Sequence, residues 1–210
     1  DSFSDFLRVF IAEDIKKEDY GSMQSDPSWH PNAIGNHLGI WDISFKKRNE
    51  SKIIMLYYQH FFEDTSGLRF ANKWDGLWGI ELTNYIEKTN ILLEYIDTMN
   101  QNINPPYVND AYYNHTVYKG GWSYKGYTIG NPFLTHNGIN PSKVVHIGAS
   151  GPILNKYFYT FKAARKINTT DFIKYYLAVK KEISRNYILN FLVFNNDKEI
   201  GVGLSFSKIL

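Results

Sequence analysis

Hydrophobic and polar residues alternate with period two along most of this chain. In the stretch WDISF, Trp41, Ile43 and Phe45 alternate with Asp42 and Ser44, and the same pattern recurs in WGIELTNY, KYFYTFKAA, YILNFLVF and IGVGLSFS. Successive side chains of a β-strand point to opposite faces, so each stretch predicts a strand with one apolar face and one face of polar, charged or small residues. Ten strands are predicted, at about 4–13, 37–48, 52–62, 75–86, 90–100, 144–153, 156–167, 172–182, 186–195 and 199–210.

Two of these segments leave alternatives open. Both faces of 52–62 look alike, so its orientation is undetermined. Segment 172–182 also fits a helix, because Tyr175, Tyr176 and Val179 follow helical spacing and Asp171 would serve as its cap. The short connections on both sides favour a strand of an antiparallel meander.

The connections between the predicted strands differ in length in a regular way. Short turns alternate with three long segments, 14–36, 63–74 and 101–143. If the last strand ends in the periplasm, all three long segments lie on the outer side, an asymmetry typical of transmembrane β-barrels. The predicted fold class is therefore all-β, with residues 1–210 forming a single antiparallel barrel domain and the long segments forming extracellular loops.

The last predicted strand, 199–210, fits this assignment. Ile200, Val202, Leu204 and Phe206 are expected to face lipid, and the glycines and serines between them to face the lumen. Through this strand the chain is expected to meet the outer-membrane assembly machinery. A soluble β-sandwich would also alternate. Aromatic residues near the strand ends and very small residues on the polar faces favour the membrane.

Composition narrows the range of functions. The formal net charge is +2 and no basic run is longer than Lys46–Arg48, so no nucleic-acid partner is expected. The chain has no cysteine, which excludes disulfides and thiolate metal sites. Its six histidines show no metal-ligand spacing, so neither a metal nor a cofactor is expected. No apolar run reaches 18 residues, so no transmembrane helix is expected.

Two stretches, 36–82 and 109–135, resemble a known family. The motifs that carry the resemblance are QHFFED with SG at 59–67, DGL at 75–77, YYN at 112–114, GWSY at 121–124 and IGNP at 129–132. Together they resemble the Wzi-type capsule assembly proteins in the form found in Bacteroidetes. The resemblance implies a monomeric outer-membrane barrel of about eighteen strands that holds capsular polysaccharide without catalysis. Since ten strands are fewer than that, the chain is expected to be the C-terminal part of a larger barrel.

The long segment 101–143 has the richest candidate chemistry. Aromatic rings stack on the C–H faces of sugars, and amides and carboxylates pair with sugar hydroxyls. The alternative is that these aromatics only pack the loop into a plug. The candidate polysaccharide-binding residues, with one from the loop 14–36, are Trp29, Tyr107, Asp110, Tyr112, Tyr113, Asn114, Trp122, Tyr124 and Tyr127.

Charged residues elsewhere have plainer roles. The adjacent Glu63 and Asp64 would suit a glycosidase only if both side chains entered one site. Neighbouring residues of a strand point to opposite faces, so the better interpretation is that these two acids form salt bridges at the base of a loop. The remaining charges on the polar faces are expected to face the lumen and to pair across the wall; they are Arg8, Asp42, Glu81, Glu94 and Lys162.

The sequence thus predicts a non-enzymatic protein of the bacterial outer membrane that binds surface polysaccharide and supports capsule assembly or attachment. Its expected partners are that polysaccharide and the lipid of the outer membrane. The main alternative is a porin for small solutes, which needs an open lumen. A membrane-embedded enzyme and a soluble sandwich lectin are further alternatives; the first would need convergent catalytic groups, and the second would be extracted without detergent.

Overall fold

The computed structural model describes most of the chain and divides it into two compact units. The described residues are 2–11, 13, 39–62, 65–68, 70, 72–100, 112–114, 119–131, 133–136, 141–154, 156–168, 173–184, 187–196 and 199–208. One unit comprises 1–42, 59–76 and 97–142, and the other comprises 43–58, 77–96 and 143–210.

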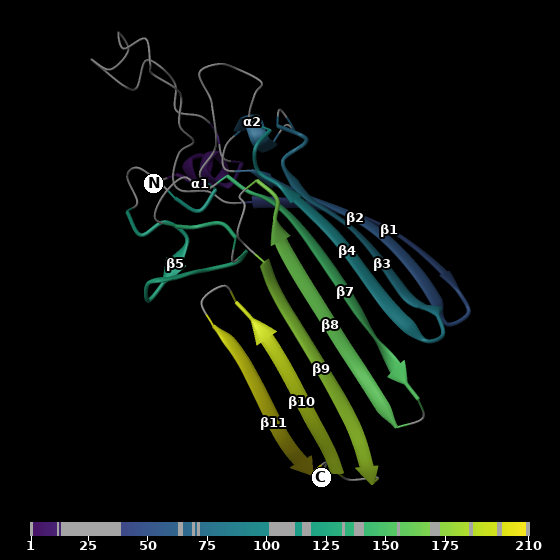
Figure 1. Ribbon diagram of the computed structural model, residues 1–210. Helices are drawn as coiled ribbons and strands as arrows, with labels where there is room; N and C mark the ends of the chain where they lie inside the picture. Colours follow the sequence, from purple (N-terminus) through teal and green to yellow (C-terminus); the bar gives the residue numbers. More distant parts are fainter. Residues whose placement is uncertain are drawn as a thin grey trace. The chain divides into compact units, whose positions relative to one another are not determined.

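Nine strands form one large sheet in which sequence neighbours are hydrogen-bonded neighbours (Figure 1). Its order is β1-β2-β3-β4-β7-β8-β9-β10-β11, the order of an up-and-down meander. Among the described residues, β1 and β11 form the two edges of this sheet, so it is open there. The strands are β1 (Gly39–Asn49), β2 (Lys52–Phe62), β3 (Gly76–Ile86), β4 (Thr89–Asp97), β7 (Lys143–Ile153), β8 (Tyr157–Lys166), β9 (Ile173–Ser184), β10 (Tyr187–Asn195) and β11 (Ile200–Lys208).

Nine of the ten predicted strands are confirmed, and their bounds agree to within a few residues. Segment 172–182, which also fitted a helix, belongs to the strand β9. The remaining elements are the hairpin strands β5 (Ser123–Tyr124) and β6 (Tyr127–Thr128) and the short helix α2 (Thr65–Leu68). None of these three was predicted.

The strand predicted at 4–13 is wrong: helix α1 occupies Phe3–Phe10. A capping box starts it, in which Asp5 N donates to Ser2 Oγ (3.2 Å) and Ser2 N donates to Asp5 Oδ2 (2.7 Å). Phe3, Phe6 and Phe10 follow helical spacing, and their rings stack in sequence with centroids 6.1 Å apart. Within the described ranges, no helix has the length and apolar character that crossing a membrane requires.

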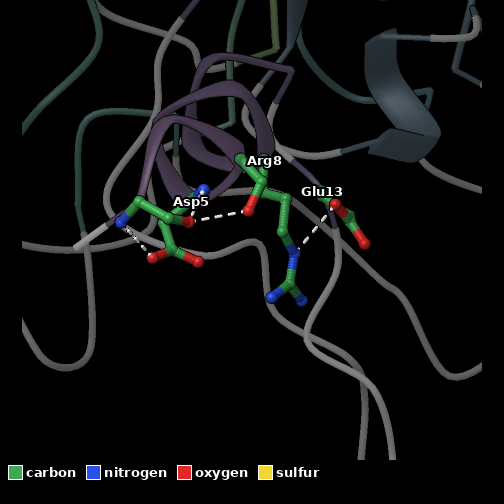
Figure 2. A network of polar contacts seen from close by, with 5 residues as sticks. Asp5, Arg8 and Glu13 are labelled. Carbon is green, nitrogen blue, oxygen red and sulfur yellow. Dashed lines mark hydrogen bonds and ion pairs between the residues drawn. The ribbon is translucent and has the colours of Figure 1, made fainter.

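Contrary to the prediction from the sequence, Arg8 is therefore not part of a barrel strand. It lies on α1, and its Nε donates to Glu13 Oε2 at 3.1 Å, as Figure 2 shows. Both side chains are about one-third exposed, so this surface ion pair contributes little to stability.

The start of α1 carries a pH-dependent prediction. The Ser2 backbone N–H, followed by the Ser2 hydroxyl, holds the pKa of the Asp5 carboxyl below its usual value. A lowered pKa means that the cap contributes its stability above the usual aspartate range and loses it as the pH falls through the lowered value. The protection of the Phe6 amide, measured by NMR as its exchange rate relative to an unstructured peptide at the same pH, should therefore fall at acidic pH in the native protein. In Asp5→Asn the protection should lack this pH-dependent step; a step of the same size would contradict the cap's role.

Cross-strand register places the predicted apolar residues of β7–β11 on one shared face. Directly opposed residues share a face, so Leu204 on β11, Phe191 on β10, Val179 on β9 and Tyr159 on β8 form a continuous row. A parallel row consists of Ala149, Phe161, Leu177, Val193 and Val202. This face is uncovered: Phe191 is 45% exposed and Leu204 71%. The core of a soluble sandwich would hide such a face.

Aromatic and basic residues lie at one end of this apolar face, and a basic residue lies at the other. At one end the Lys181 ammonium lies 5.2 Å from the centre of the Tyr157 ring, and Tyr187 stacks on Phe206 with centroids 5.3 Å apart. Arg165 lies on the same face near the other end of β8. From Tyr157 to Arg165 the strand rises about 26 Å at ~3.3 Å per residue, which covers roughly 20 Å of membrane thickness at a barrel strand's tilt.

The opposite face explains the small residues of the pattern. The Tyr57 ring lies directly over Gly79, where an added Cβ would meet Tyr57 Cζ at 2.0 Å. The Phe194 ring covers Gly201 in the same way, with 2.2 Å from that Cβ to Cε1. The glycines on this face therefore provide room for large side chains from neighbouring strands.

Polar side chains on the same face pair across the strands. Tyr57 reaches over Gly79 and donates to Glu94 Oε1, while Glu94 Oε2 lies 3.2 Å from His146 Nδ1. On the neighbouring strands β1 and β2, Gln59 donates to Asp42 Oδ2 at 3.0 Å. Asp42 and Glu94 were predicted to pair with the other charged residues of this face, whereas the partners found are Gln59 for Asp42, and Tyr57 and His146 for Glu94.

Candidate functional site

The hairpin β5–β6 presents two tyrosines side by side. Tyr124 and Tyr127 are directly opposed in its register, so their rings lie on the same face. Lys125 (φ +49°) and Gly126 (φ +80°) form the two-residue turn between them, and positive φ at both positions is the type I′ geometry that suits a tight hairpin. Tyr124 is 66% exposed and Tyr127 is 78% exposed.

The pairing continues one residue further on each side. Ile129 N donates to Trp122 O at 3.0 Å, which places Trp122 and Ile129 on the same face as the two tyrosines. We call these four residues the aromatic hairpin face. Trp122 is half-buried, and Ile129 is 49% exposed.

Tyr113 anchors this hairpin to the rest of its unit. Its carbonyl accepts from Trp122 N (2.9 Å), and its hydroxyl oxygen accepts from Asn131 N (2.9 Å). Gly121 (φ +49°) lies so close that an added Cβ would meet Tyr113 O at 2.2 Å, so glycine is required there by both space and backbone conformation. Since both strands are tied to one residue, the tyrosine pair is held in a fixed position.

Tyr112, the neighbouring candidate, lies in a buried polar cluster. Its hydroxyl donates to Asp75 Oδ2 at 2.6 Å and accepts from Asn72 Nδ2 at 2.8 Å. Asp75 Oδ1 accepts from Asn100 N at 2.6 Å. Tyr112 is 2% exposed, Asp75 0% and Asn72 6%, so this cluster is part of the structural support.

His60 extends the buried cluster to β2. Its Nδ1 lies 2.9 Å from Asp75 O and its Nε2 lies 2.8 Å from Gly67 O, and the side chain has no exposed surface. The Phe70 ring stacks on it with centroids 4.7 Å apart. The motifs around 59–67, 75–77 and 112–114 thus come together in space, a convergence that the sequence did not reveal.

The candidate residues therefore divide into separate groups. Trp122, Tyr124 and Tyr127 share one face, whereas Tyr112 and Tyr113 support that region from inside; Asn114 is described as half-buried. Trp29, Tyr107, Asp110, Glu63 and Asp64 lie outside the described residues.

The described residues show no arrangement suited to holding a metal ion. Nowhere among them do three or more histidine, aspartate or glutamate side chains gather as a ligand set would require. The buried Asp75 carboxylate accepts hydrogen bonds from the Tyr112 hydroxyl and the Asn100 N–H.

Comparison with known proteins identifies the family. The family model described as "Capsule assembly protein Wzi" matches residues 1–136, which is well over half of the chain and includes the buried cluster and the aromatic hairpin face. No curated protein and no solved structure matches the chain. The match confirms the resemblance carried by the QHFF, DGL, YYN and GWSY motifs, and the chain belongs to the Wzi capsule assembly protein family.

Proposed function

We propose that this chain is a non-enzymatic, monomeric outer-membrane β-barrel protein that binds surface polysaccharide and supports capsule assembly or attachment. Membership of a capsule assembly family supports the process. The observation that carries the binding role is the aromatic hairpin face, where Tyr124 and Tyr127 present adjacent, exposed rings on an anchored hairpin. Adjacent aromatic rings suit the C–H faces of successive sugars in a polymer.

The uncovered apolar face of β7–β11 supports the membrane location. Rows of aliphatic and aromatic residues cross up to five strands, with rings and Lys181 at one end and Arg165 near the other. Lipid is the environment in which such a face is stable. The edges of β1 and β11 would both be paired in the complete barrel, because strand backbone in a bilayer needs all its hydrogen bonds satisfied. The edge of β11 would also be the part offered to the assembly machinery.

The side chains on the opposite face favour polysaccharide binding over the porin function. Tyr57 and Phe194 lie across that face and cover glycines of the neighbouring strands, which reduces the space that an aqueous path would need. In planar bilayers the purified protein should show little conductance. Large, steady conductance would favour the porin instead.

The binding role predicts a specific loss. Tyr124→Ala combined with Tyr127→Ala should reduce polysaccharide retention on cells and in affinity gels by roughly tenfold or more, since stacking contributes about 1 kcal/mol per ring and many copies act along one polymer. Tyr85→Ala is the matched control. Tyr85 is also an exposed tyrosine, it lies on β3, and the Lys52 ammonium lies 5.8 Å from its ring centre. Equal retention by a folded double variant and by the control would refute the role of this face.

A further inference from the structure

Both charged residues in the described segment 119–131, which includes the aromatic hairpin face, are lysines. Lys119 and Lys125 are both exposed, and neither forms an ion pair with the described residues. The Lys125 ammonium lies 5.5 Å from the centre of the Tyr124 ring. A sugar stacked on that ring would therefore have a cation within reach of its substituents.

The charge is unusually one-sided along the sequence as well. Residues 111–170 contain no aspartate or glutamate, although the chain as a whole carries 21 acidic residues in 210. The same stretch holds seven basic residues. Lys119 and Lys125 belong to the unit that carries the hairpin, and the other five, Lys143, Lys156, Lys162, Arg165 and Lys166, belong to the other unit. The net charge of +2 for the whole chain conceals this local excess.

Acids lie elsewhere in the same unit, and two of them, Asp75 and Asp97, are buried. Asp75 is 0% exposed and occupied by Tyr112 and Asn100. Asp97 is 4% exposed, and one of its oxygens accepts from Met99 N at 2.9 Å. Because both carboxylates are buried and already accept hydrogen bonds, neither is available at the surface as a partner for the lysines.

We propose that the aromatic hairpin face binds an anionic polysaccharide, one whose sugars carry carboxylate or other acidic groups. This inference rests on the proposed function and adds the chemical class of the ligand. Tyr124 and Tyr127 stack on the sugar rings, while Lys125 and Lys119 pair with the acidic substituents. Each exposed charge pair adds only a few-fold in affinity, but repeated acidic units along a polymer multiply the effect.

The test is affinity electrophoresis of the detergent-solubilised protein against three probes. Alginate is a carboxylated polysaccharide, dextran of matched length is a neutral one, and phosphatidylglycerol vesicles offer anionic groups on a lipid surface. The variants are Lys119→Gln with Lys125→Gln, and the matched control Lys52→Gln, whose ammonium also lies over a tyrosine ring. A heated-versus-unheated gel verifies that each variant is folded.

The expected result is that alginate retards the protein about tenfold more strongly than dextran, with a preference that falls as salt rises. The double variant should lose this preference while keeping the weak dextran retardation, and Lys52→Gln should behave as the unchanged protein. Equal retardation by both polysaccharides, or a preference that survives the double substitution, overturns the inference and leaves the proposed function standing. Strong binding to the vesicles without retardation by alginate overturns it in favour of a lipid surface. No retardation by either polysaccharide overturns the proposed function as well.

Discussion

Asp75→Asn should destabilise the unit that carries the hairpin by about 3 kcal/mol. The Asp75 carboxylate accepts from the Tyr112 hydroxyl and from Asn100 N, both at 2.6 Å, and it has no exposed surface. An amide of the same size offers one acceptor oxygen and one donor group, so one of these two donors would face another donor. A buried bond to a charged group contributes about 1.5–3 kcal/mol, and an unpaired buried donor adds a penalty of similar size.

Limited proteolysis of the folded protein is the measurement for this prediction. Cleavage within 97–142 should accelerate at least tenfold in Asp75→Asn. The matched control is Asp42→Asn. The Asp42 carboxylate also accepts a hydrogen bond, from the Gln59 side-chain amide, but its position is exposed. Exposed pairs contribute under about 1 kcal/mol, so the control should be cleaved at nearly the unchanged rate. Similar rates for the two variants would show that the buried cluster does not hold this unit together.

Gly79→Val should prevent the sheet from assembling in its present form. An added Cβ at Gly79 would lie 2.0–2.5 Å from three atoms of the Tyr57 ring, closer than any packing allows. The ring is held in place by its hydroxyl, which donates to Glu94. Relief would require Tyr57 to leave both Gly79 and Glu94, at a cost of about 3 kcal/mol or more, so the ratio of folded to unfolded protein should fall by roughly a hundredfold.

A second substitution makes this prediction specific. Gly79→Val with Tyr57→Ala should recover much of the folded, heat-modifiable protein, because the valine then occupies the space that the ring vacates. Gly120→Val is the matched control, since the nearest atom to its added Cβ is Ser123 Oγ at 4.0 Å. If Gly79→Val folds as well as Gly120→Val, the ring does not occupy the position described.

The strands of the large sheet were predictable because their signal is local. Period-two alternation over nine to twelve residues, ended by short polar turns, locates a strand without reference to its partners. The register then shows that Tyr159, Phe161, Leu189, Phe191 and Val193 share one face, as the alternation indicated.

The helix at α1 shows where a local signal is ambiguous. Leu7, Val9 and Ile11 alternate with Phe6, Arg8 and Phe10 as a strand would, and the spacing of Phe3, Phe6 and Phe10 equally fits a helix. Ser2 with Asp5 three residues later decides between the two by capping the first turn. This pair was visible in the sequence and was the available evidence against a strand.

The site was only partly predictable, since it combines one local feature with one long-range feature. Trp122, Tyr124 and Tyr127 were candidates by composition, and the Lys125–Gly126 turn that aligns the two tyrosines was a readable but very short hairpin signal. In contrast, the cluster of His60, Asp75 and Tyr112 joins residues up to 52 positions apart in the sequence. Such contacts are fixed by the fold, and one sequence carries no direct record of them.

The most direct test of the account is the behaviour of the protein in its native envelope. The cells are fractionated, and the outer-membrane fraction is run on a gel with and without prior heating. The account predicts that the protein is found in that fraction and that its mobility changes on boiling, as it does for a closed transmembrane barrel. Recovery in the soluble fraction with the same mobility before and after boiling would contradict it, and the uncovered face of β7–β11 would then need another protein surface in place of lipid.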